Sequence, residues 1–252
     1  MNLSRRLLLF AALSALGFPT FSTAQEKPND AIAPVPREGK LMERHKSFNE
    51  RVKQGNVDLI FIGDSITQGW ENAGKNVWAE FYAKRNAVNL GIGGDRTQHV
   101  LWRLDHGNID GINPKLAVLM IGTNNSGTNT SEQIADGIKL IVEKLRTKLP
   151  NTKVLILAIF PRADNFDANK NKVEKGTKDD AKRKINEGAN EIVKKLADNK
   201  MVYFLDIGQR FLAADGTLSR EVMPDLLHLN ESSYRTWAES IEPKVKELLG
   251  EK

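Results

Sequence analysis

The chain has 252 residues, a formal net charge of +5 from 37 Lys and Arg against 32 Asp and Glu, and no cysteine. Without cysteine the protein forms no disulfide and carries no lipid-modified N-terminal cysteine. The basic residues alternate with acidic ones instead of gathering in one stripe, which argues against a nucleic-acid-binding protein.

Residues 1–24 have the pattern of a secretory signal peptide. Arg5 and Arg6 precede a short apolar run, Leu7–Phe18, and small residues follow it. The run is shorter than the roughly 20 residues that a membrane-spanning helix needs, so we expect no membrane anchor. We predict cleavage after Ala24 and export to the periplasm or the extracellular space, by either the Sec or the twin-arginine route.

Residues 25–55 are expected to form a polar leader and an N-terminal helix, and residues 56–250 to form one α/β domain. Within this domain short apolar runs alternate with helical patterns, and the charged insertion 164–184 is expected at the surface. In chain order we predict a strand at 57–62, a strand at 87–90, a helix at 97–104, a strand at 116–121, a helix at 130–149, a strand at 154–160, a helix ending near 197, a strand at 202–205 and a helix from 230.

The five apolar runs are continuous rather than alternating, which is typical of strands buried on both faces of a parallel sheet. A ligand of such a sheet binds beyond the carboxyl ends of its strands. Chemistry is therefore expected just after each run. The residues at those positions are Asp64 and Ser65, Gly91–Asp95, Gly122–Asn125, Pro161 and Arg162, and, beyond the fifth run, Asp225 and His228.

A hydroxyl, an imidazole and a carboxylate at these positions are the parts of an acyl-transfer site. Ser65 would be the nucleophile and His228 the base, a task that suits imidazole because it exchanges protons near neutral pH. Asp225 precedes His228 by three residues, so one helical turn would place it beside the ring that it orients. The amide of Ser65, a glycine amide and the side chain of Asn124 could hold the oxyanion.

Other residues have less specific interpretations. Asp64, Asn125 and Arg162 are candidate substrate contacts, and Arg162 could steer an anionic substrate or form an ordinary salt bridge. The stretch GWENAGKN at 69–76 lacks the Ser or Thr that holds magnesium in a P-loop, and GIGGDR lacks the third glycine of a dinucleotide fingerprint. Asp225, His228 and Glu231 have no second histidine nearby to complete a metal site. We expect neither a cofactor nor a metal.

Four short blocks carry a family resemblance. Gly63-Asp64-Ser65, the GIGGD stretch, GTNN at 122–125 and DLLHL at 225–229 follow the order of the four blocks of the GDSL, or SGNH, hydrolases. The chain resembles this family over nearly all of residues 57–249. It most resembles the catalytic subunits of the intracellular platelet-activating-factor acetylhydrolases, especially over 89–125. The resemblance implies a flavodoxin-like three-layer α/β/α sandwich whose five-stranded parallel sheet has the order 2-1-3-4-5.

The resemblance also implies site roles and an activity. Ser65, Asp225 and His228 form the triad, and the amides of Ser65 and Gly94 hold the oxyanion together with the Asn124 side chain. The implied protein is a secreted serine esterase that removes acetyl or other short acyl groups, preferably from carbohydrate. Lysophospholipase, thioesterase or platelet-activating-factor-type acetylhydrolase activity is the alternative within this class. A non-catalytic carbohydrate-binding module is the alternative outside it. The acetylhydrolase subunits pair, so a homodimer is also expected, on a surface that the sequence does not define.

Overall fold

The computed structural model describes residues 28–165 and 175–251. The expected signal peptide and part of the 164–184 insertion lie outside the described residues. At the centre is a five-stranded parallel sheet in the order β2-β1-β3-β4-β6, which confirms the predicted order with β6 as the fifth strand. The strands are β1 (Leu59–Gly63), β2 (Ala87–Gly91), β3 (Leu116–Met120), β4 (Lys153–Leu157) and β6 (Val202–Leu205).

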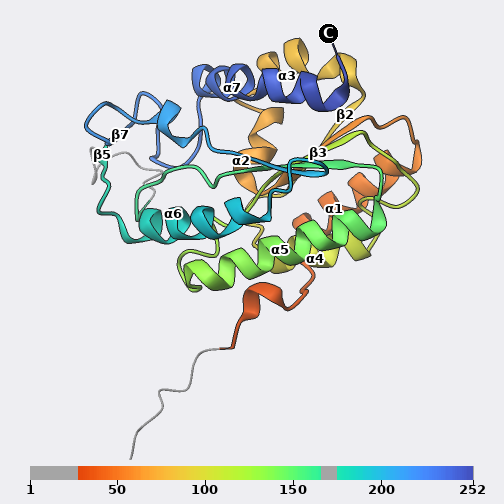
Figure 1. The fold of residues 1–252 in the computed structure, drawn as a ribbon, viewed down its shortest axis with the longest axis horizontal. Coiled ribbons are helices and arrows are strands. Elements are labelled where there is room, and N and C mark those ends of the chain that lie inside the picture. Colours follow the sequence, from red (N-terminus) through yellow and green to blue (C-terminus); the bar gives the residue numbers. More distant parts are fainter. Residues whose placement is uncertain (1–27, 166–174, 252) are drawn as a thin grey trace, which may run out of the picture.

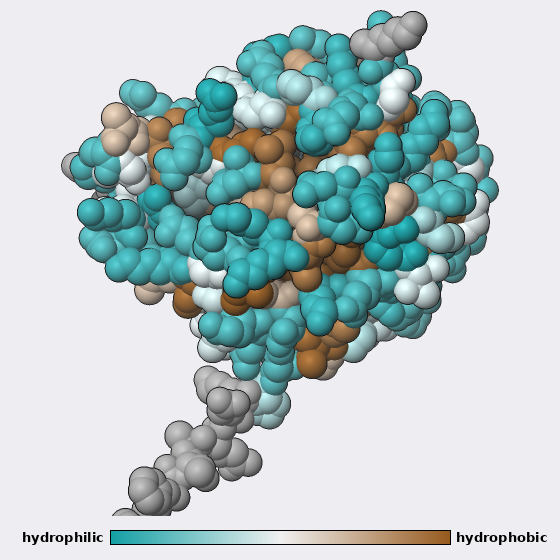
Figure 2. Space-filling model, viewed as in Figure 1, coloured by the Kyte–Doolittle hydropathy of each residue, from teal (hydrophilic) through white to brown (hydrophobic). Residues whose placement is uncertain are grey.

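Helices cover both faces of the sheet, so the molecule has the three layers expected of the family (Figure 1). One face carries α1 (Gly39–Lys53), α4 (Thr97–Asp105), α5 (Ser131–Lys148) and α6 (Ala181–Val193). The other carries the short α2 (Ser65–Gln68), α3 (Lys75–Phe81) and α7 (Glu231–Leu249). On the face drawn in Figure 2, hydrophilic side chains cover the helices, and hydrophobic ones are visible between the layers.

Two cores fill the spaces between these layers because the central strands are buried on both sides. In β1, Ile60 and Ile62 belong to the core under α1, α4, α5 and α6, whereas Leu59 and Phe61 belong to the core under α3 and α7. Side chains of a strand alternate between faces, so an unbroken apolar run supplies both cores at once. This is the physical basis of the continuous runs in the sequence.

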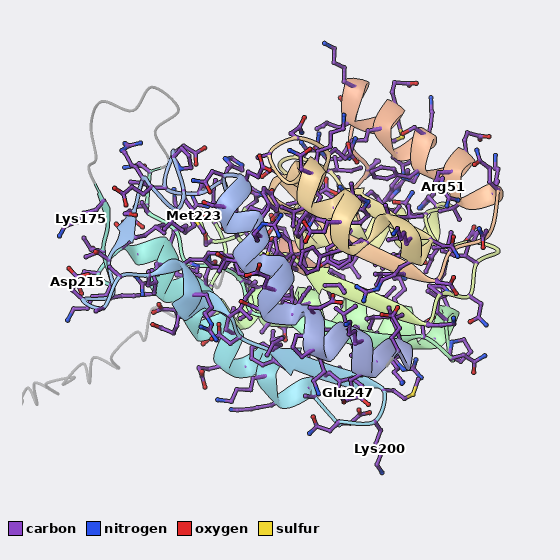
Figure 3. All side chains as sticks on the ribbon, turned by 90° about the horizontal axis from the view of Figure 1, so that it is seen from above. Arg51, Lys175, Lys200, Asp215, Met223 and Glu247 are labelled. Carbon is purple, nitrogen blue, oxygen red and sulfur yellow. The ribbon has the colours of Figure 1, made fainter. Side chains whose placement is uncertain are left out.

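The carboxyl ends of the three strands at one side of the sheet are level with one another. Gly63, the last residue of β1, pairs in register with Gly91 of β2 and with Met120 of β3. The loops that follow these strands therefore leave the sheet at one place. A separate antiparallel pair, β5 (Lys175–Gly176) and β7 (Leu218–Ser219), lies apart from the sheet. Seen from above, α3 and α7 lie side by side, and Met223 lies toward Lys175 and away from Glu247 (Figure 3).

Candidate active site

Ser65 stands at the carboxyl end of β1, where the chain turns directly from strand into α2. The side chain of Asp64 caps this helix, since its Oδ1 accepts a hydrogen bond of 3.0 Å from the amide of Ile66. The turn requires glycine at position 63, because a Cβ there would lie 2.5 Å from the carbonyl oxygen of Met120. A tight strand-to-helix turn therefore presents the Ser65 hydroxyl at the edge of the sheet.

His228, far along the chain, contacts Ser65, and Asp225 contacts His228. Nε2 of His228 lies 2.9 Å from Ser65 Oγ, and Nδ1 of His228 lies 2.6 Å from Oδ2 of Asp225. Oδ1 of Asp225 accepts hydrogen bonds from the backbone amides of Leu227 and His228. Partial burial raises the pKa of Asp225, but the hydrogen bonds from His228 and from the Leu227 amide outweigh it and lower that pKa to about 2. The carboxylate is therefore ionised at neutral pH beside the ring.

The segment that carries Asp225 and His228 is a turn and not the helical turn that their spacing suggested. Leu226 between them has φ +64°, a left-handed conformation that is rare for a residue with a branched side chain. Its side chain is fully buried in the core, and its carbonyl accepts a hydrogen bond of 3.0 Å from the Ala163 amide. Packing and this hydrogen bond hold the strained turn, from which the His228 ring reaches Ser65 and the Asp225 carboxylate reaches the His228 ring. Sequence spacing gave no sign of this strain.

The loops after β2 and β3 lie on the other side of Ser65. Gly94 is exposed and has φ +74°, and a Cβ on its neighbour Gly93 would lie 3.9 Å from Ser65 Cβ. Nδ2 of Asn124 donates a hydrogen bond of 2.9 Å to the Asp95 carbonyl, which ties the two loops together. The structure thus gathers all five residues expected from the family resemblance, namely Ser65, Gly94, Asn124, Asp225 and His228, around the carboxyl ends of β1 to β3.

A buried ion pair between Arg103 and Asp95 lies next to the loop that contains Gly94. Nε of Arg103 lies 2.8 Å from Oδ2 of Asp95, and both residues are almost completely buried. The same guanidinium donates to Oδ1 of Asn108 at 2.7 Å and to the carbonyl of Gly63 at 3.4 Å. Arg103 therefore connects the exit of β1 with the residue that follows Gly94. Sequence reasoning did not identify it, because an arginine inside an amphipathic helix usually faces solvent.

The three candidate substrate contacts are all buried. Asn125 is 0% exposed, and its amide is hydrogen-bonded to Thr97, Gln98 and Asn129. Arg162 is 4% exposed and donates to the carbonyls of Thr123 and Ala163. Asp64 is 1% exposed and caps α2. These positions fit residues that hold the loops of the site, and they offer no exposed group for a substrate.

The buried carboxyl of Asp64 leads to a prediction for the pH dependence of stability. Burial raises its pKa from 3.8 to about 7, against the lowering effect of the hydrogen bond from Ile66. The folded state then binds more protons than the unfolded state between these values, so the free energy of unfolding should fall as pH rises through this window. Asp64→Asn keeps an oxygen acceptor for the Ile66 amide and removes the titration. The free energy of unfolding of the variant minus that of the wild type, measured in urea, should be larger at pH 8 than at pH 5. An equal difference at both pH values would contradict the prediction.

Within residues 28–165 and 175–251, no three His, Asp or Glu side chains gather in a way that could hold a metal ion. Glu231, which the sequence places near Asp225 and His228, accepts a hydrogen bond from Asn76. None of the helices in the described ranges is long and apolar enough to cross a membrane.

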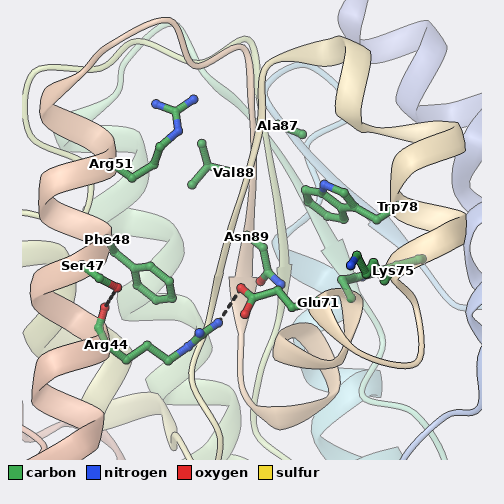
Figure 4. Close-up of a pocket in the computed structure, with 11 residues that line it drawn as sticks. Arg44, Ser47, Phe48, Arg51, Glu71, Lys75, Trp78, Ala87, Val88 and Asn89 are labelled. Atoms are coloured by element: carbon green, nitrogen blue, oxygen red, sulfur yellow. Dashed lines mark hydrogen bonds and ion pairs between the residues drawn. The ribbon is translucent and has the colours of Figure 1, made fainter.

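A separate groove of about 510 Å³ runs along the edge strand β2, between α1 and α3 (Figure 4). Phe48 on α1 and Trp78 on α3 line its opposite sides. Arg44 forms an ion pair of 2.6 Å with Glu71 and donates to the Gly91 carbonyl. Ser47 contributes a hydroxyl, but that group donates to the Arg44 carbonyl, and no imidazole is among the described residues that line the groove. The groove therefore lacks the parts of an acyl-transfer site.

Comparison with known proteins agrees with this geometry. Residues 61–236 match the model of the GDSL-like lipase/acylhydrolase family. The chain is 34% identical over 233 residues to the platelet-activating factor acetylhydrolase IB subunit alpha1 of Homo sapiens, covering 91% of this chain and 94% of that protein.

A solved GDSL-like lipase from Bacteroides thetaiotaomicron has a TM-score of 0.60 at 18% identity, covering 81% of this chain and 97% of its own. A carbohydrate acetylesterase from Sinorhizobium meliloti has a TM-score of 0.55 at 19% identity, covering 77% and 100%. The two solved structures share the fold, and the matched family span contains every residue gathered around Ser65. The protein therefore belongs to the GDSL-like lipase/acylhydrolase family and is a hydrolase.

Proposed function

We propose that the protein is an exported serine esterase that hydrolyses short-chain acyl esters, above all acetyl esters carried on carbohydrate. The observation that carries this proposal is the continuous hydrogen-bonded chain from Ser65 Oγ through the His228 ring to Asp225. Such a chain activates a hydroxyl that is otherwise a weak nucleophile. The signal-peptide pattern of residues 1–24 supports export.

In the proposed mechanism, Ser65 Oγ attacks the ester carbonyl carbon while His228 Nε2 takes the hydroxyl proton. The carbonyl oxygen becomes an oxyanion, held by the amides of Ser65 and Gly94 and by the Asn124 side chain. When the C–O bond breaks, His228 passes its proton to the departing alcohol and an acyl-serine remains. A water molecule then loses a proton to His228 and attacks the acyl carbon, which releases the acid and returns the proton to Ser65.

The substrate class rests on the relatives. The human relative is an acetylhydrolase by name, and one solved structure of the same fold is a carbohydrate acetylesterase. Acetyl is the acyl group common to both, and an exported enzyme would meet polysaccharides. The 34% identity to the acetylhydrolase subunit favours a platelet-activating-factor-type phospholipid as the second candidate.

The purified protein should hydrolyse 4-nitrophenyl acetate, and a fluorophosphonate probe should label Ser65 at one site per chain. A non-catalytic carbohydrate-binding module would do neither. Comparing acetylated xylan, acetylated monosaccharides, a lysophospholipid and platelet-activating factor at equal ester concentration would then rank the substrate classes. A protein that turns over no ester and leaves Ser65 unlabelled would overturn the proposal.

The proposed role of Asn124 gives a further expectation. Asn124→Ala should lower kcat for 4-nitrophenyl acetate by roughly 10²–10³-fold, because one oxyanion donor is lost at the transition state. The variant also loses its tie to the Asp95 carbonyl, so urea unfolding should be measured beside the kinetics. Asn76→Ala is a matched control, since this amide binds Glu231 on the surface. A kcat for Asn124→Ala within about threefold of the control would rule out the assigned role.

A further inference from the structure

The N-terminal leader runs from the first described residues to the edge of the candidate active site. The carbonyl of Ala31 accepts a hydrogen bond of 2.7 Å from the buried hydroxyl of Thr97. The amide of Val35 donates at 3.3 Å to the carbonyl of Gln98. The leader is thus fixed along the start of α4, the helix that follows the loop of Gly94. Two residues later it places the side chain of Arg37 over that loop.

The Arg37 guanidinium lies directly on Gly94. Its Nη1 donates a hydrogen bond of 3.2 Å to the Gly94 carbonyl, and it also lies 3.4 Å from Nδ1 of His99. A Cβ on Gly94 would lie 3.3 Å from Arg37 Nη2, so the contact is close. Gly94 is exposed and Arg37 is half-buried, so the cation lies near the surface beside the residue whose amide is proposed to hold the oxyanion.

A second arginine, Arg96, belongs to the loop after β2 and also contacts His99. The backbone amide of Arg96 donates a hydrogen bond of 3.0 Å to Nδ1 of His99, the ring atom that Arg37 also contacts. The side chain of Arg96 crosses to the loop after β3, where its Nη1 donates at 3.3 Å to the exposed hydroxyl of Thr128. The Arg37 guanidinium therefore contacts the loop after β2, and the Arg96 guanidinium contacts the loop after β3.

Neither guanidinium lies within ion-pair distance of a carboxylate among the described residues. Asp95 is paired with Arg103, and Glu71 is paired with Arg44. Burial, followed by the charges of Arg37, Arg96 and Arg103, lowers the pKa of His99 to about 4, so this ring is neutral at physiological pH. The guanidinium groups on this side of the site are therefore held by uncharged partners, namely the Gly94 carbonyl and the His99 ring for Arg37 and the Thr128 hydroxyl for Arg96.

We infer that Arg37 and Arg96 form a cationic rim that binds a negatively charged group, a carboxylate or a phosphate, on the alcohol part of the ester. The inference rests on the proposed function and narrows its substrate class to acylated anionic molecules. The acyl group itself is short, so the charge belongs to the leaving alcohol. Guanidinium groups suit this task because their planar N–H donors match carboxylate and phosphate oxygens. Arg162, the cation that the sequence suggested for anionic substrates, is buried and donates to the carbonyls of Thr123 and Ala163.

The test compares two acetate esters that differ in charge. 4-Acetoxybenzoate carries a carboxylate on its leaving group, and 4-acetoxybenzamide is its neutral counterpart. We expect the wild type to have the higher kcat/KM for the anionic ester, and added salt to lower only that value. Arg37→Gln and Arg96→Gln should each lower kcat/KM for the anionic ester by about three- to fivefold, and the double variant by about tenfold. The neutral ester should change by less than about twofold, and Arg235→Gln, which removes a surface arginine paired with Glu80, should change neither.

The outcomes separate the two proposals. If Arg37→Gln slows both esters equally, the guanidinium only holds the Gly94 loop, and the rim is rejected. Equal rates of the wild type on both esters, without a salt effect, would also reject it while the esterase proposal stands. If the wild type hydrolyses neither ester, the proposed function fails, and the rim fails with it.

Discussion

Replacing Ser65 by alanine should lower kcat/KM for 4-nitrophenyl acetate by about 10⁴-fold or more. The proposed mechanism has no substitute for the Ser65 hydroxyl, because His228 would be left without the atom that it activates at 2.9 Å. What remains in the variant is the catalysis that an oxyanion hole and substrate binding supply on their own. Fluorophosphonate labelling should disappear together with turnover.

Ser47→Ala is the matched control for this experiment. Ser47 is an exposed serine of the same chain, whereas Ser65 is half-buried, and the Ser47 hydroxyl donates to the Arg44 carbonyl within α1 and not to an imidazole. The control should keep the wild-type rate and labelling, and both variants should unfold in urea at the same midpoint as the wild type. A Ser65→Ala enzyme that keeps even a tenth of the wild-type rate would contradict the assignment of the nucleophile.

Arg103→Met should lower the free energy of unfolding by about 3–5 kcal/mol. Arg103 is 1% exposed, and its loss would leave the Asp95 carboxylate, at 0% exposure, without its ion-pair partner. Asp95 Oδ1 already has no hydrogen-bond partner, so Oδ2 depends on Arg103. Burial already raises the pKa of Asp95, and it would favour the protonated carboxyl further once the arginine is gone. Urea unfolding at pH 7 measures the cost.

Arg235→Met provides the comparison on the surface. Arg235 pairs with Glu80 at 2.7 Å, but both side chains are about half exposed, so its loss should cost about 0–1 kcal/mol. The double variant Asp95→Asn with Arg103→Met should recover part of the loss, because no uncompensated charge remains. Two outcomes would show that the buried ion pair does not stabilise the fold as predicted. One is that Arg103→Met lowers the free energy of unfolding no more than Arg235→Met does. The other is that the double variant loses as much as Asp95→Asn and Arg103→Met lose together when measured singly.

The arrangement of the sheet could be predicted from the sequence because its signals are local. Continuous apolar runs such as Leu116–Ile121 are typical of strands buried on both faces, and the helical patterns between them favour parallel connections. The position of Ser65 could be predicted for the same reason, because the polar residues that follow an apolar run mark the end of a buried strand. The residues around Ser65 were found because parallel strands bring their carboxyl ends to one edge.

The features that were missed depend on contacts between distant segments. The buried pairing of Arg103 with Asp95 and the left-handed turn at Leu226 have no sequence signature, because each is stabilised by packing and hydrogen bonds from elsewhere in the chain. The leader was expected only as a polar segment, yet it delivers Arg37 to the Gly94 loop from 57 residues away.

The sequence by itself determined the parallel sheet and the residues with suitable chemistry through its periodicity, and its short motifs determined the family, whose resemblance implied the strand order. Only the tertiary structure decided which of those residues are exposed and which charges are compensated. It buried Asn125 and Arg162 and left Arg37 and Arg96 at the rim. The physical reason is that the burial and the ion pairing of a side chain depend on all the residues that pack around it. Those residues come from segments far apart along the chain, so their contacts cannot be read from local sequence.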